Sequence, residues 1–166
     1  MVYGLTTFSK TFVWSANKGG LSMREKGLNV TQLVAICFAA GVIGGLAVVL
    51  LSRVLFGLGI SATFGVKAPI SLKSPDIYRP LFWAGLWGIP FGLFVKSAWE
   101  RLYLFGLLYF LAPVLALFLI FLPMSGAGYF GLQQGGPMFT VYLLLVNVPY
   151  GIITALAARA IIGNEP

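Results

Sequence analysis

Hydrophobic residues in this chain are gathered into long runs that short polar segments separate. The runs are rich in Leu, Val, Ile, Phe and Ala and carry ionisable side chains only near their ends; they cover about 29–56, 80–98, 102–124 and 138–162. An α-helix needs about 20 apolar residues to cross the hydrocarbon core of a bilayer, where it satisfies its own backbone hydrogen bonds. The pattern therefore predicts an all-α integral membrane protein in which 29–166 form a four-helix transmembrane bundle.

Three of the four predicted spans contain an internal proline, namely Pro90, Pro113 and Pro149. A proline inside a helix leaves the carbonyl four residues earlier without its usual donor and bends the helix. In a membrane, a neighbouring helix, a side chain or water must satisfy that carbonyl. We therefore expect bent helices, and we take Pro90 and Pro149 as candidate positions for a polar zone inside the bilayer.

Two short strings recur in the same order in the two halves of the chain. Residues 90–92 read Pro-Phe-Gly and residues 149–151 read Pro-Tyr-Gly, while 64–66 and 130–132 both read Phe-Gly followed by an aliphatic residue. Such parallels predict two repeated helical hairpins related by an axis along the membrane normal. Coincidence in a chain rich in Gly and Phe explains them equally well, so both interpretations stay open.

Small residues recur every four positions in the second predicted span, at Ala84, Gly88 and Gly92. This spacing puts them on one helix face, and membrane helices approach one another closely along such faces. We expect this strip to serve packing inside the bundle, rather than a dimer interface or a cofactor groove. Two spans offer partners for this strip. The first has the small residues Ala40, Gly41, Gly44 and Gly45, and the fourth has Gly151, Ala155 and Ala158.

The chain is basic, with 11 Lys and Arg against 4 Asp and Glu and a formal charge of +7. These side chains lie at the ends of apolar runs, where lipid head groups and the positive-inside bias account for them. We therefore expect no nucleic-acid partner. Seven of the eleven would lie on the side of both termini, which predicts cytoplasmic termini in a multi-pass protein of the bacterial inner membrane.

Residues 1–28 are basic and contain no long apolar core, unlike a secretory signal peptide. We interpret them as a cytoplasmic N-terminal tail. An alternative is that residues 1–22 form an extension ahead of a natural start at Met23, since the segment that begins there leads directly into the first span.

The chain offers few groups for catalysis, because it has no His, one Cys and four acidic residues. Metal sites, haem ligation and general acid–base chemistry depend on such groups. We therefore expect no enzymatic activity, no metal and no cofactor. Cys37 lies within the first apolar run, and we expect it to be an unreactive buried or lipid-facing residue.

Polar side chains at membrane depth are the candidates for a site, because burying them costs free energy. Asn147 is the strongest, although one hydrogen bond within the bundle would also explain it. Arg79, at the outer end of the second span, is a candidate for binding an anion or a lipid head group. Gln133 and Gln134 lie in the uncharged 125–137 loop, which we expect to be external rather than re-entrant.

These patterns do not name a biological process. We expect a non-enzymatic integral membrane protein that acts as an accessory, packing or regulatory subunit. Its expected contacts are the lipid bilayer and either a partner membrane protein or further copies of itself. The alternative is a small transporter or channel that works as a homo-oligomer, with its site near the Pro90 and Pro149 kinks.

Overall fold

The computed structural model of this chain describes residues 29–95 and 97–163, and all regular structure within them is helical. The expected all-α fold is therefore confirmed for these residues, whereas the N-terminal tail and the question of Met23 lie outside them. The long helices are α2 (Val30–Gly57), α4 (Tyr78–Val95) and α8 (Leu132–Ile162). The shorter elements are α3 (Ile60–Thr63), η1 (Trp99–Arg101), α5 (Leu102–Tyr109), α6 (Leu111–Ala116), η2 (Leu117–Phe121), α7 (Leu122–Met124) and η3 (Tyr129–Gly131).

Three segments are long and apolar enough to cross a membrane, which indicates a multi-pass membrane protein. They are Val30–Gly57, Trp99–Met124 and Tyr129–Ile162. The second of the four predicted spans corresponds to α4, which is not among these three. Its 18 residues include Arg79 and two prolines, and these residues lower its hydropathy.

The first long helix begins at a capping box. The Asn29 side chain accepts the Gln32 backbone N–H at 2.7 Å, and the Gln32 side chain accepts the Asn29 backbone N–H at 3.1 Å. These two bonds satisfy backbone donors that a helix start leaves unpaired. The helix is then continuous for 28 residues, to Gly57.

The third apolar segment is interrupted rather than forming one regular helix. The α5 helix ends at Tyr109, whose carbonyl would bond the N–H that Pro113 lacks. Farther along, η2 is a π-helical turn in which the Leu122 N–H donates to the Leu117 carbonyl. Pro123 follows directly and also lacks an N–H. Two prolines therefore accompany the irregular backbone of this segment.

The other two internal prolines differ from Pro113 in their effect. The α4 helix continues through Pro90, and the α8 helix continues through Pro149. The non-helical backbone of α8 lies instead at Gly136, with φ 66° and ψ −165°. This left-handed φ suits glycine because glycine has no Cβ. The 125–137 loop therefore ends in a kink near the start of α8.

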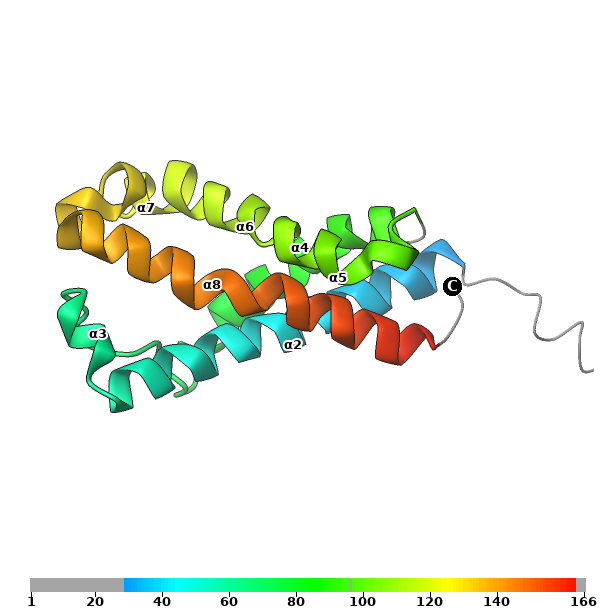
Figure 1. The fold of residues 1–166 in the computed structure, drawn as a ribbon, viewed down its shortest axis with the longest axis horizontal. Helices are drawn as coiled ribbons and strands as arrows, with labels where there is room; N and C mark the ends of the chain where they lie inside the picture. The colour runs from blue at the N-terminus through cyan, green and yellow to red at the C-terminus, as the bar shows by residue number, and fades with distance from the viewer. Residues whose placement is uncertain (1–28, 96, 164–166) are drawn as a thin grey trace, which may run out of the picture.

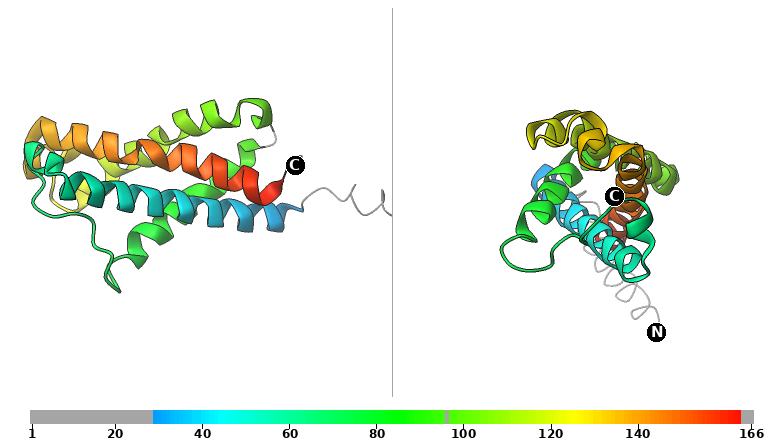
Figure 2. Two further views of the ribbon diagram at one scale, coloured as in Figure 1. Left: turned by 60° about the horizontal axis from the view of Figure 1, so that its bottom comes forward. Right: turned by 90° about the vertical axis from the view of Figure 1, so that its left-hand side faces the viewer.

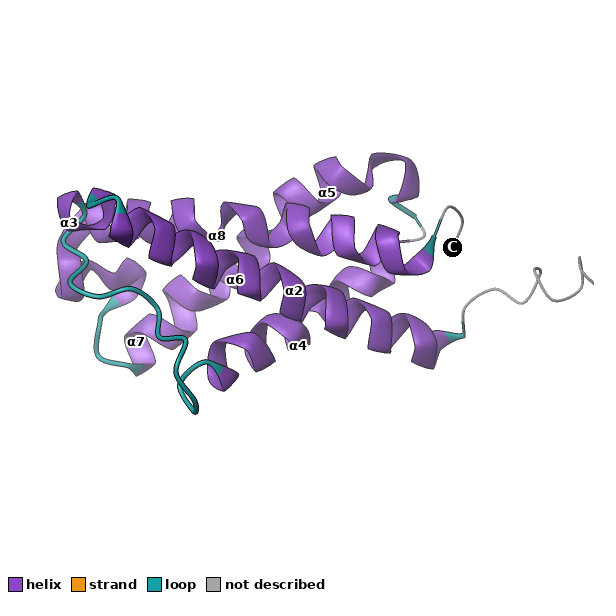
Figure 3. Ribbon diagram, turned by 90° about the horizontal axis from the view of Figure 1, so that it is seen from below, coloured by secondary structure: helices purple, strands orange, loops and turns teal. Residues whose placement is uncertain are grey.

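The helices form an elongated bundle in which α2 packs against both α4 and α8, and α5 packs against α8. The start of α2 and the end of α8 lie at one end of this bundle, whereas α3 and α7 lie at the other (Figure 1). We call these the terminal end and the loop end. At the loop end, the connection between α3 and α4 crosses to the start of α4 (Figure 3). A second side view shows α2 and α8 running next to each other along the bundle (Figure 2, left).

The small-residue strip of α4 faces α2. A Cβ built on Gly41 would lie 2.5 Å from the Ala84 carbonyl oxygen and 2.9 Å from the Gly88 Cα. One turn away, a Cβ on Gly92 would lie 2.8 Å from the Cys37 Sγ. The two backbones are therefore so close that larger side chains do not fit between them.

Gly44 and Gly45 extend this packing on α2 in two directions. A Cβ on Gly45 would collide with the Ala84 side chain, and one on Gly44 would collide with the Thr154 hydroxyl of α8. A second close contact joins α5 to α8, where a Cβ on Gly106 would lie 2.5 Å from the Gly151 carbonyl oxygen. Glycine thus sets the separation of three helix pairs.

Candidate ligand cavity between the helices

A cavity of about 400 Å³ lies among the helices, within the 300–1,000 Å³ that is typical of small-molecule sites. Residues from all four apolar segments of the chain line it. They are Gly45, Val48 and Val49 of α2, Pro80, Trp83, Ala84 and Trp87 of α4, Pro113, Leu117 and Phe121 of the third segment, and Leu143, Val146, Asn147 and Tyr150 of α8, with Ile70 and Arg79 at the loop end. The cavity therefore belongs to the bundle as a whole.

The interrupted third segment supplies one wall. Pro113, Leu117 and Phe121 are spaced four residues apart and line the cavity together. Phe121 meets Trp83 of α4 edge to face, with ring centroids 5.0 Å apart. This aromatic pair connects the third segment to α4 on one side of the cavity.

Two tyrosines bond the backbone of α4 beside the cavity. The Tyr150 hydroxyl of α8 donates to the Ala84 carbonyl oxygen at 2.7 Å, and the Tyr109 hydroxyl of α5 donates to the Trp87 carbonyl oxygen at 2.6 Å. Trp87 lies in the turn that precedes Pro90, next to Leu86, whose carbonyl would bond the N–H that Pro90 lacks. Both hydroxyls thus have partners within the protein, as buried polar groups require.

Asn147 lies on the cavity wall and is half-buried. Its Nδ2 donates to the Leu143 carbonyl oxygen of the preceding turn at 2.7 Å. An asparagine amide can form further hydrogen bonds beyond this one. The side chain therefore has a structural role in α8 and also presents an amide to the cavity.

Arg79 lies in the first turn of α4 and is exposed. Among the described residues that line the cavity, Arg79 alone carries a charge. The cavity is thus charged at the loop end and apolar along most of its remaining wall. Asn147 and Arg79, which are 68 positions apart in the sequence, are brought to one site by the fold.

The other candidate residues are distributed around this cavity. Pro90 and Pro149 are not on its wall, although Asn147 and Tyr150 flank Pro149 on both sides. Gln134 lines a neighbouring cavity of about 530 Å³ at the loop end. Gln133 lines neither cavity and packs near Gly128. Three residues, Ile70, Leu143 and Val146, line both cavities.

Hydrogen bonds hold the segment between α2 and α4 against the loop end. The Ile70 N–H donates to the Ser52 hydroxyl at 3.1 Å, and the Arg53 guanidinium donates to the Ile70 carbonyl at 3.4 Å. The buried Ser61 hydroxyl of α3 donates to the Tyr142 hydroxyl at 3.3 Å. The first two bonds position Ile70, which lies on the cavity wall, and the third connects α3 to α8.

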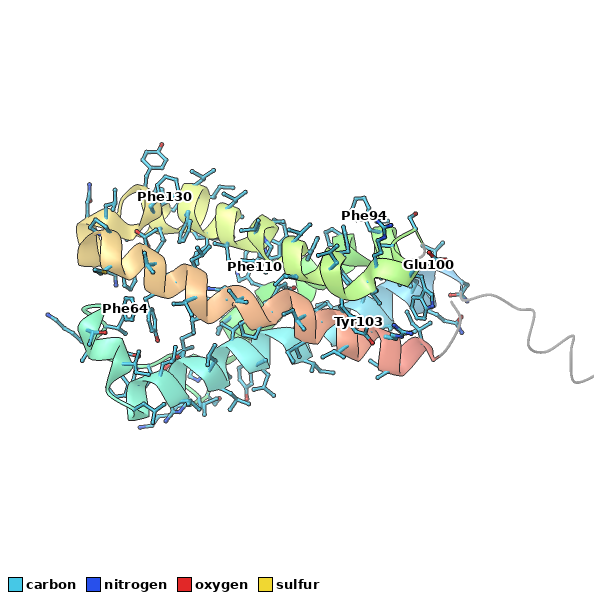
Figure 4. All side chains as sticks on the ribbon, viewed as in Figure 1. Phe64, Phe94, Glu100, Tyr103, Phe110 and Phe130 are labelled. Atoms are coloured by element: carbon cyan, nitrogen blue, oxygen red, sulfur yellow. The ribbon has the colours of Figure 1, made fainter. Side chains whose placement is uncertain are left out.

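The loop before α8 also folds back on the helices at this end. The Thr140 hydroxyl donates to the Phe130 carbonyl oxygen at 2.7 Å, and the Gln133 N–H donates to the Ala127 carbonyl at 3.0 Å. The side chains of Phe64 and Phe130 lie at this loop end, far from Glu100 and Tyr103 at the terminal end (Figure 4).

The terminal end carries a separate open pocket of about 790 Å³ that Glu100 and Arg101 help to line. Close by, the Arg159 guanidinium lies 5.6 Å from the Trp99 ring and 5.3 Å from the Tyr103 ring. Such cation–π contacts connect the end of α8 to the start of α5. They account for Arg159 as a packing residue.

Sequence reasoning identified Asn147 and Arg79 but missed Tyr150 and Pro113 as wall residues. Both belong to features that the sequence already showed, Tyr150 to the Pro-Tyr-Gly string and Pro113 to the internal prolines.

Cys37 is buried against α4. Within the described residues, no group of three or more His, Cys, Asp or Glu side chains is placed to hold a metal ion.

No family model matches this chain, and neither a curated protein nor a solved structure is significantly similar to it.

Proposed function

We propose that this chain is a non-enzymatic, four-span membrane protein that binds a membrane-soluble small molecule in the interhelical cavity. The cavity carries this proposal, because its volume of about 400 Å³ suits a small molecule and residues from all four apolar segments line it. The proposal favours the small-transporter alternative, with Asn147 as its wall residue at membrane depth.

The fourth crossing is part of this proposal and is assigned to α4. With 18 residues at about 1.5 Å of rise each, α4 is roughly 27 Å long, close to the hydrocarbon thickness of about 30 Å. It packs along α2, which is itself long enough to cross. Four crossings would put both termini on one side, which the distribution of basic residues predicts to be the cytoplasm of a bacterial cell.

The two-hairpin repeat is also a proposal, and the glycine contacts support it. The glycine that follows the Pro-aromatic pair packs on the preceding span in both halves. Gly92 packs against Cys37 of α2, and Gly151 packs against Gly106 of α5. Equivalent string positions therefore make equivalent contacts within their own hairpins.

The accessory-subunit function is the second candidate, and the same glycine contacts favour it. Helices that approach so closely at Gly41 and Gly88 leave no path between them. A protein of this kind would hold a partner membrane protein without moving anything across the bilayer. Access to the cavity distinguishes the two candidates.

Cysteine accessibility at Asn147 measures that access. In a Cys37→Ala background, the Asn147→Cys variant would be treated in membranes with N-ethylmaleimide, which is apolar, and separately with a charged methanethiosulfonate. The matched control is Val114→Cys, because Val114 is 2% exposed and does not line the cavity. Labelling after denaturation in dodecyl sulfate shows that each thiol is intact.

We expect the apolar reagent to label Asn147→Cys and to leave Val114→Cys unmodified. Additional labelling by the charged reagent would show a hydrated site and support transport. If neither reagent labels folded Asn147→Cys, the cavity is closed and the ligand-binding proposal is wrong. The accessory-subunit function is then the one that remains.

A further inference from the structure

The loop end of the bundle combines positive charge with an apolar cavity. The basic residues there are Arg53, Lys67, Lys73 and Arg79, and the acidic one is Asp76. Of these, Arg79 alone lines the cavity between the helices. A ligand in this cavity thus meets one cation at its loop end, and none of the described wall residues carries a negative charge.

Away from Arg79, the cavity wall is mostly apolar. The Tyr150 hydroxyl donates to a backbone carbonyl of α4, and the Asn147 amide donates to one of α8. The other wall residues away from the loop end are aliphatic or aromatic, including Trp87, Leu117 and Val146. An apolar chain therefore suits most of this region, and the Asn147 amide is the wall group that can form a further hydrogen bond.

We propose that the cavity binds an amphiphile that has one anionic head group and an apolar chain. This inference rests on the proposed function and names the ligand class of that site. The head group, a carboxylate or a phosphate, pairs with the guanidinium of Arg79, whose planar donors match either anion. The chain lies inward between α4, the third segment and α8, where apolar burial favours it.

Binding is measured in a neutral detergent with brominated stearate, because bromine quenches tryptophan fluorescence on contact. The reporter chain keeps Trp87 on the cavity wall and carries Phe at the other three Trp positions. Brominated stearyl alcohol serves as the uncharged ligand with the same chain. Inorganic phosphate is the free anion without a chain.

We expect stearate to quench Trp87 saturably and to bind about tenfold more tightly than the alcohol, as a charge-assisted hydrogen bond implies. Arg79→Gln should bring stearate to the affinity of the alcohol, whereas Arg79→Lys should keep part of the preference. The matched control is Lys73→Gln, which removes the same charge at the loop end away from the cavity and should keep the full preference.

The outcomes separate this inference from the proposed function. Equal affinity for stearate and alcohol in the reporter chain overturns the anionic head group and leaves ligand binding in the cavity intact. Displacement of stearate by inorganic phosphate would show that the site takes a free anion, which also overturns the amphiphile. Absence of saturable quenching by either ligand contradicts both proposals. Should Arg79→Gln unfold, the comparison of stearate with alcohol in the reporter chain and in its Arg79→Lys variant decides.

Discussion

Single hydroxyl groups connect helices that are distant in the sequence. Tyr150 and Tyr109, from α8 and α5, both donate to carbonyls of α4 that lie within two turns of Pro90. The rings also pack, since Phe91 meets Tyr109 edge to face with centroids 5.1 Å apart. The hydrogen bond and the ring therefore contribute separately to the stability of the bundle.

Removing one hydroxyl should have a small effect, and removing a ring should have a large one. Tyr150→Phe should lower the free energy of unfolding by about 0.6 kcal/mol, the average for interhelical hydrogen bonds in a membrane. Tyr150→Ala should cost about 3–5 kcal/mol, as for other large aromatic truncations. Unfolding in increasing dodecyl sulfate measures both. Equal losses in the two variants would contradict this division between bond and ring.

Helix pairs depend on glycine wherever two backbones meet. Gly88 of α4 faces the Cys37 carbonyl and the Gly41 backbone of α2. By contrast, Gly57 at the end of α2 has nothing within 4 Å of a built Cβ. Two glycines in helices thus differ only in what surrounds them.

The same substitution at these two positions should therefore give opposite results. Gly88→Leu should destabilise the bundle by at least about 1–3 kcal/mol, because overpacking forces the backbones apart. Gly57→Leu should leave the melting temperature within experimental error of the parent. Melting and size-exclusion profiles in mild detergent measure the difference. An unchanged Gly88→Leu variant would show that α4 is not held against α2 in the membrane.

The number of crossings concerns the molecule as a whole. Four crossings place the 125–137 loop and the C-terminus on opposite sides of the membrane. Three crossings, with α4 on the surface, keep them on opposite sides but reverse the side of every segment after α4. Cysteines at Ser125 and Asn164 in a Cys37→Ala background should therefore be labelled from opposite sides of the membrane if α8 crosses it. Labelling of both from one side would contradict the four-span arrangement.

A companion position tests α4 itself. A cysteine at Lys73, before α4, and one at Ser97, after it, should also be labelled from opposite sides. Labelling from the same side would assign α4 to the membrane surface and leave three crossings. Permeabilised membranes, in which all four positions should react, provide the control.

The helical fold and the membrane environment could both be predicted from the order of residues alone. Long apolar runs such as Val30–Gly57 leave few alternatives, because only helices and closed barrels satisfy the backbone in lipid. The four-residue spacing of Ala84, Gly88 and Gly92 also predicted a packing face, and these residues lie against α2. These features are local, and local patterns can be read directly from neighbouring residues.

Which faces meet, and where space is left between them, became visible only in the packed bundle. A membrane helix is apolar on all sides, so its sequence does not mark the inward face as it does in an amphipathic helix of a soluble protein. The cavity is lined by residues of separate segments, such as Gly45, Pro113 and Asn147, which only the packing of the helices brings together. Arg79 shares that wall for the same reason, since contacts between distant segments follow from how the helices pack.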